Sequence, residues 1–192
     1  LRSLAKSDAS LQVTTNQETG EALLAGMGEL HLEITVFRLE EEQNIKVKVS
    51  PPIVVYRESV EGNNRGRSFE GKSPNRHNRF MIECEPLSPE VVAALRDGHF
   101  GNGTVRSGDA KEVGNKFGEL GMDKDKMRKI YAISGTNVLV NDTKGIQGLH
   151  ETRELIIESF NEVCKKGPVA DEPVMGMMVR LVDAKLHEDA IH

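Results

Sequence analysis

The chain has 192 residues, of which 38% are hydrophobic and 29% are charged, and such a composition is typical of a globular protein with one large domain or two small ones. The formal net charge of −5 excludes a protein that coats nucleic acid over its whole surface, while a local basic patch stays compatible with it. No apolar run approaches the roughly 18 residues of a membrane span, so the sequence predicts a soluble protein without a membrane partner. Cys84 and Cys164 lack the spacing of a metal site or a disulfide framework, which predicts two buried reduced thiols.

The first 50 residues mix strand and helix patterns. Alternation over residues 11–15, a turn-rich stretch and an apolar run over 22–25 together predict a β-hairpin. Residues 29–43 are ambiguous, because they begin with a period of two and continue as a charged, helix-forming run. Alternating apolar residues over 45–49 predict a further strand, and Ser50-Pro51-Pro52 ends it. We expect the domain boundary there.

The rest of the chain also predicts a mixture of strands and helices. A polar stretch rich in Gly and Arg predicts a long exposed loop over residues 58–79. Apolar alternation then predicts strands over 80–84, 137–140 and 174–186. One helix is expected between Ser88 and Gly98, and a second, short helix is expected to begin after a capping Asp123 and to carry Met127 and Ile130. A longer helix is expected from Ile146 to Val163, and Gly167-Pro168 would end it. The predicted class is α+β in two units.

Residues 66–73 satisfy the spacing G-x-x-x-x-G-K-[ST] of a phosphate-binding P-loop. A P-loop follows a buried strand and opens a helix whose N–H groups face the phosphates. Here the upstream residues are polar, and Pro74 keeps Ser73 out of helical torsions. A P-loop phosphotransferase is therefore a rejected hypothesis, and nucleotide titration would test it. His187 and His192 are five residues apart, so they do not share a helix face as a metal pair would; the sequence predicts no catalytic, cofactor or metal site.

The charge distribution is more informative. Residues 57–79 hold six basic and three acidic side chains, a net charge of +3 over 23 residues, which leaves −8 on the other 169. A basic segment on an acidic body suits docking to a phosphate backbone. The low aromatic content argues against base stacking along a single strand. A solvated loop without a partner fits the composition equally well.

Four stretches resemble a known family: Gly26–Glu33 (GMGELHLE), Ser50–Glu58 (SPPIVVYRE), Lys72–Arg79 (KSPNRHNR) and Leu186–His192 (LHEDAIH). The first two resemble the translocase GTPases of the ribosome. The last two are more similar to the elongation factor 2 family of archaea and eukaryotes, in its archaeal form, than to bacterial elongation factor G. The resemblance covers almost the whole chain.

This resemblance implies two partial domains. Residues 1–50 would be domain III, a ferredoxin-like β/α sandwich lacking its first strand, in which residues 29–43 are helical and Gly26–Glu33 serves interdomain packing. Residues 51–192 would be domain IV, a β/α fold similar to ribosomal protein S5 domain 2, truncated at its C-terminus. Leu1 in place of Met agrees with a piece of a longer protein. GTP and magnesium would bind in a GTPase domain outside this part, which is then not itself an enzyme.

The resemblance also implies a function. Domain IV would enter the A site of the small ribosomal subunit during GTP-dependent translocation of tRNA and mRNA in the cytoplasm, and its tip loops would contact the decoding region. His192 matches the histidine that diphthamide-synthesis enzymes modify to diphthamide. The alternative is a ribosome-assembly GTPase related to elongation factor 2, which the ending Asp189-Ala190-Ile191-His192 disfavours. The expected RNA-binding residues of the tip loops are Lys72, Ser73, Pro74, Asn75, Arg76, His77, Asn78, Arg79, His187 and Asp189.

Overall fold

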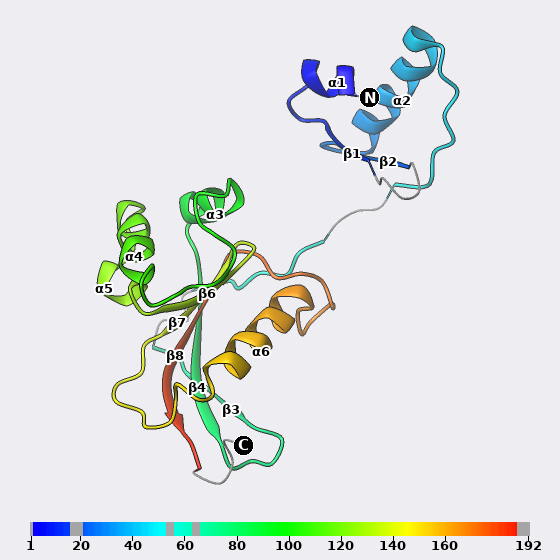
Figure 1. The fold of residues 1–192 in the computed structure, drawn as a ribbon. Helices are drawn as coiled ribbons and strands as arrows, with labels where there is room; N and C mark the ends of the chain where they lie inside the picture. The colour runs from blue at the N-terminus through cyan, green and yellow to red at the C-terminus, as the bar shows by residue number, and fades with distance from the viewer. Residues whose placement is uncertain (1, 16–20, 53–55, 63–65, 188–192) are drawn as a thin grey trace. The chain divides into compact units, whose positions relative to one another are not determined.

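The computed structural model describes residues 2–15, 21–52, 56–62 and 66–187. It divides the chain into two compact units, Leu1–Val55 and Tyr56–His192, and Figure 1 shows their helices and strands. Each unit has a hydrophobic core of its own. Among the described residues, no helix is both long enough and apolar enough to cross a membrane.

The described residues of the first unit form two helices and a two-stranded sheet. Helix α1 spans Arg2–Ser7, strands β1 and β2 span Gln12–Thr15 and Ala22–Ala25, and helix α2 spans Glu29–Gln43. The strands pair antiparallel, which confirms the predicted hairpin. Burial of apolar side chains holds this small unit together, and its core consists of Leu4, Leu11 and Leu39 with Ala5 and Leu24 packed against them.

Residues 29–43 are helical, as the family resemblance implies and the period of two does not. Helix α2 ends where Asn44 adopts a left-handed conformation, with φ of 52°, and donates its N–H to the Leu39 carbonyl. The strand predicted over residues 45–49 was wrong, because this stretch is paired with no strand of the described residues and leaves Ile45 49% and Val49 60% exposed. Alternation alone does not form a strand without a neighbouring strand to supply hydrogen bonds.

In the second unit, the described strands form one six-stranded mixed sheet in the order β3-β4-β8-β7-β6-β5. Only the β7–β8 pair is parallel among the described strands; the other pairs are antiparallel. The strands are β3 (Phe69–Lys72), β4 (Arg79–Pro86), β5 (Gly103–Thr104), β6 (Ile130–Ser134), β7 (Asn137–Asn141) and β8 (Met177–Lys185).

In the part of this unit that the structure describes, four helices cover the two faces of the sheet: α3 (Pro89–Arg96), α4 (Ala110–Glu119), α5 (Lys124–Met127) and α6 (Arg153–Lys165). Successive side chains of a strand point to opposite faces. Accordingly, Val138 and Val140 of β7 pack in the cluster of α3, α4 and α5, whereas Leu139 packs in the cluster of α6. On the face that α3–α5 cover, these helices do not reach the end of β3, β4 and β8 that lies farthest from them, as Figure 1 shows.

Several predicted elements hold in this unit and others need correction. Helix α3 begins after Ser88 with Pro89 in its first turn, as predicted, and Asp123 caps α5. The predicted loop over residues 58–79 was wrong in its second half, where β3 forms by pairing with β4. Helix α6 begins at Arg153 rather than Ile146, because residues 147–152 form turns, with Gly148 at φ of 75°.

Two smaller differences concern residues 110–130. Helix α4 was missed by the sequence reading, since Gly114 and Gly118 lower its helix propensity. Gly114 is required there: a Cβ on it would lie 2.9 Å from the backbone nitrogen of Arg128. Ile130 opens β6 instead of continuing α5.

Candidate nucleic-acid interface

The β3–β4 connection is a tight, internally hydrogen-bonded turn. Ser73 N–H donates to the Asn78 carbonyl at 3.0 Å, and Arg76 N–H donates to the Ser73 carbonyl at 2.8 Å. The Asn75 carboxamide oxygen accepts the Ser73 hydroxyl at 2.6 Å and the His77 N–H at 3.1 Å. With Arg76 held at φ of 61°, these bonds fix a turn whose charged and ring side chains face solvent.

A second segment, far along the chain, joins this turn. His187 lies just after β8, and its N–H donates to Asn78 Oδ1 at 3.0 Å. The rings of His77 and His187 lie with centroids 5.3 Å apart. We call residues 72–79 and 185–187 the tip; Figure 1 shows β3, β4 and β8 reaching this end of the second unit, away from α4 and α5.

The tip carries a row of cations. Lys72 pairs with Arg79, and Arg79 pairs with Lys185, so Arg79 lies between the two lysines in a row across three adjacent strands, on one face of the sheet. Glu70 bridges two of them, 3.0 Å from Lys72 Nζ and 3.4 Å from Arg79 Nη1. The hydrogen bond from Lys72, aided by its charge and that of Arg79, lowers the pKa of Glu70. Glu70 therefore stays ionised and offsets part of the repulsion in the row.

The structure brings residues 72–79 and His187, which the sequence predicts as candidates, together at this one tip, and it adds Lys185, which the sequence does not single out. Lys185 joins the row only through the β4–β8 register, which the sequence does not reveal. Asp189 and His192 lie outside the described residues. The P-loop spacing over residues 66–73 has no P-loop geometry, because residues 69–72 form β3 and the chain turns into β4 instead of a helix.

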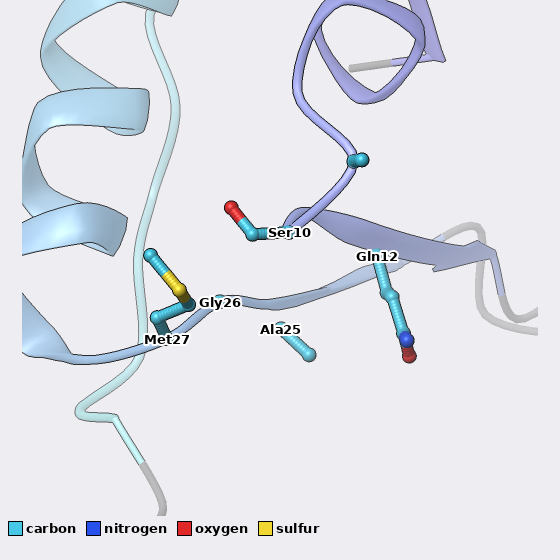
Figure 2. Close-up of a pocket in the computed structure, with 6 residues that line it drawn as sticks. Ser10, Gln12, Ala25, Gly26 and Met27 are labelled. Atoms are coloured by element: carbon cyan, nitrogen blue, oxygen red, sulfur yellow. The ribbon is translucent and has the colours of Figure 1, made fainter. Parts of the chain in front are cut away.

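Two surface hollows elsewhere offer less to a nucleic acid. The first lies in the first unit and is lined by uncharged residues, including Ser10, Gln12 and Met27, as Figure 2 shows. The second runs along α6 and is lined by Glu154, Glu158 and Glu162, with Lys165 as its one basic side chain. Carboxylates repel phosphate, so the charged row of the tip is the better candidate for binding RNA.

A buried charge network stabilises the sheet behind the tip. Arg180 of β8 is 6% exposed, and its guanidinium donates to Glu83, to Glu85 Oε1 at 2.6 Å and to Asp142 Oδ2 at 3.0 Å. Burial acts to lower the pKa of Arg180, but Glu85, Glu83 and Asp142 outweigh it and raise the pKa. The network ties β4, β8 and the end of β7, so it gives the tip a rigid base.

In the first unit, the Gly26–Glu33 motif organises a histidine. His31 Nδ1 accepts the Met27 N–H at 3.2 Å, and His31 Nε2 lies 2.9 Å from Asp8 Oδ2. With Nδ1 as the acceptor, the Nε2 proton points to Asp8. A Cβ on Gly26 would lie 2.8 Å from His31 Nδ1, which explains the glycine. His31, in the first turn of α2, therefore links Met27 of the β2–α2 connection to Asp8, the residue after α1.

Comparison with known proteins agrees with these two units. Residues 1–51 match the family model described as Elongation Factor G, domain III, and residues 103–192 match Elongation factor G, domain IV. Over all 192 residues the chain is 51% identical to the elongation factor 2 of Thermoplasma volcanium, 52% to that of Picrophilus torridus and 49% to that of Methanosarcina mazei.

The chain belongs to the elongation factor G and elongation factor 2 family. It spans 26% of the length of each of these relatives, with residues assigned to domains III and IV. The mixed α+β fold agrees with these domains. The tip turn over residues 73–78 lies between the ranges of the two models, within the stretch that aligns with the full relatives.

Proposed function

We propose that the tip is the RNA-facing end of a GTP-dependent elongation factor that promotes translocation of tRNA and mRNA. The observation that carries this proposal is the row Lys72, Arg79 and Lys185, with Arg76 exposed in the adjoining turn. Like charges directly opposite one another destabilise a sheet. Their concentration at one end of an otherwise acidic chain suits contact with phosphate groups of RNA.

In this proposal, residues 1–50 act as domain III and residues 51–192 as part of domain IV. Domain IV enters the A site of the small subunit, and the tip loops that hold Lys72 to Arg79, His187 and Asp189 contact the decoding region. His192 is the substrate of the diphthamide-synthesis enzymes, and diphthamide adds a long cationic side chain to the same RNA-facing end. The exposed side chains of Met27 and Leu30, 82% and 68% exposed, support interdomain packing by Gly26–Glu33.

GTP and magnesium bind in the GTPase domain of the whole protein in this account, in the cytoplasm, and the present part performs no chemistry of its own. Its residues position RNA by charge and shape. The ribosome-assembly GTPase is not favoured, because the relatives that align with all 192 residues of the chain are named elongation factor 2.

The salt dependence of RNA binding tests the proposal on the chain itself. The affinity for a hairpin of small-subunit decoding-region RNA is measured over a range of salt concentrations for the parent chain and for Arg76→Ala/Arg79→Ala. Removing two phosphate contacts is expected to reduce the slope of log K against log salt by about 2. A matched variant, Lys111→Ala/Lys116→Ala on α4, is expected to leave the slope unchanged. Equal slopes for both variants would refute the proposal.

A further inference from the structure

The carboxamide of Asn78 connects two parts of the tip that are 109 residues apart. Asn78 is 6% exposed, whereas its neighbours in the turn, Asn75, Arg76 and His77, are exposed. A buried polar side chain inside a solvent-facing turn is costly unless it makes a hydrogen bond. Here Asn78 Oδ1 accepts the His187 N–H at 3.0 Å.

The backbone of Asn78 is itself fixed. Its N–H donates to Ser73 Oγ at 3.1 Å and its carbonyl accepts the Ser73 N–H at 3.0 Å. The side chain thus projects from a residue that closes the turn on both sides. Because the side-chain amide is buried and its backbone is fixed, its oxygen occupies one position. The hydrogen bond therefore fixes the His187 backbone relative to the β3–β4 turn.

His187 is the point where this second segment leaves the sheet. Strand β8 ends at Lys185, so the bond from Asn78 attaches the chain two residues beyond the strand. The contact between the His77 and His187 rings, 5.3 Å between centroids, lies beside it.

We propose that Asn78 is a positioning residue, which holds Leu186 and His187, the described residues after β8, against the β3–β4 turn so that the two parts of the tip meet RNA as one surface. The role in RNA recognition rests on the proposed function above. The attachment of His187 by Asn78 does not depend on it, and the two are tested by separate measurements.

Hydrogen exchange of the His187 amide, followed by NMR on the 192-residue chain, reads the bond directly. In Asn78→Ala the amide is expected to exchange about fivefold faster, relative to its intrinsic rate, because one net hydrogen bond is lost. Asn78→Asp retains an acceptor oxygen and is expected to keep most of the protection. His187→Ala deletes the ring but retains the N–H, so it separates the ring contact from the bond and is expected to stay protected.

Unchanged exchange in Asn78→Ala would overturn the proposal. So would a loss of protection in His187→Ala equal to that in Asn78→Ala, because the ring contact would then hold the segment. Should Asn78→Ala fail to fold, His187→Pro deletes the donor and leaves the buried amide in place. Backbone order parameters at Leu186 are then expected to fall, and an unchanged value would contradict the role of the bond.

RNA binding distinguishes failure of this inference from failure of the proposed function. Asn78→Ala keeps every positive charge of the tip, so it is expected to weaken binding of the decoding-region hairpin about threefold to tenfold with an unchanged salt slope. Arg76→Ala is expected to reduce the slope and leave the His187 amide protected. Faster exchange in Asn78→Ala with no change in RNA affinity would uphold the attachment and refute the joint RNA surface.

Discussion

Replacement of Arg180 by Met tests how far the second unit depends on its buried charge network. The guanidinium is the shared partner of Glu83, Glu85 and Asp142. The side chains of Glu83 and Glu85 are only 11% and 12% exposed, while that of Asp142 is 20% exposed. In Arg180→Met, two carboxylates stay close together and largely buried without the cation that compensates them.

Removing one partner of a buried ion pair costs about 3–5 kcal/mol of folding free energy. We expect the lower end, about 3 kcal/mol, because Asp142 has solvent access and a second cation, Lys129, at 3.6 Å. For a unit of this size that corresponds to a melting temperature lower by roughly 10 °C. Thermal unfolding followed by far-ultraviolet circular dichroism measures it.

The matched variant is Arg180→Met/Glu83→Gln/Glu85→Gln, in which the buried carboxylates are also neutral. It is expected to recover a large part of the lost stability, because the cost arises from unpaired charge rather than from lost packing. A single variant that melts within about 2 °C of the parent chain would refute the reasoning, since a loss of about 3 kcal/mol lowers the melting temperature by several times that amount. Equal destabilisation of the single and triple variants would refute it as well.

Three further predictions concern the same unit. Ser88→Ala removes the oxygen that accepts the Val91 N–H at the start of α3 and is expected to destabilise the unit by about 1 kcal/mol, measured as a shift in urea midpoint; no shift would contradict the cap. Gly114→Ala places a Cβ against the Arg128 backbone and is expected to cost about 1–3 kcal/mol, whereas Gly108→Ala, where a Cβ meets nothing within 4 Å, serves as its control and is expected to change little. The pKa of Glu58 is lowered because the N–H of Ala170, followed by those of Val169 and Glu172, donates to its carboxylate. The stabilising contribution of the Glu58 carboxylate is therefore present above its unfolded pKa and is lost as pH falls through its folded pKa. The difference in urea midpoint between the parent chain and Glu58→Gln is expected to shrink on acidification, and a difference independent of pH would contradict this role.

The elements that could be predicted from the sequence are those with local causes. Pro89 after Ser88 fixes the start of α3, and the turn-rich stretch before Ala22 separates the two strands of the first hairpin. Both signals act within a few residues, so they can be recognised in the sequence without knowledge of the fold. Helix α2 could not be decided by periodicity, because its apolar residues lie on both of its sides, with Ile34 and Phe37 exposed and Leu39 buried.

The parts that escaped prediction depend on contacts between distant residues. Strand β3 forms because β4 supplies its hydrogen bonds, and its sequence FEGK has no strand pattern of its own. Lys185 belongs to the tip because of the β4–β8 register. The Asn78–His187 hydrogen bond joins residues that are 109 positions apart in the sequence. A register shift of one residue would move Lys185 to the other face, so the charge of residues 57–79 predicted the place of the candidate site but not its full membership.

The most direct test is the rate of mRNA movement on the ribosome, the activity proposed above for the full-length protein, followed by fluorescence after mixing with GTP. The variant Arg76→Glu/Arg79→Glu is compared with Lys111→Glu/Lys116→Glu, which makes the same charge change on α4, at the other end of the second unit. The account predicts translocation slowed about tenfold or more by the tip variant alone, with GTP hydrolysis retained in both. Equal translocation rates for the two variants would contradict the assignment of the tip as the RNA-facing end.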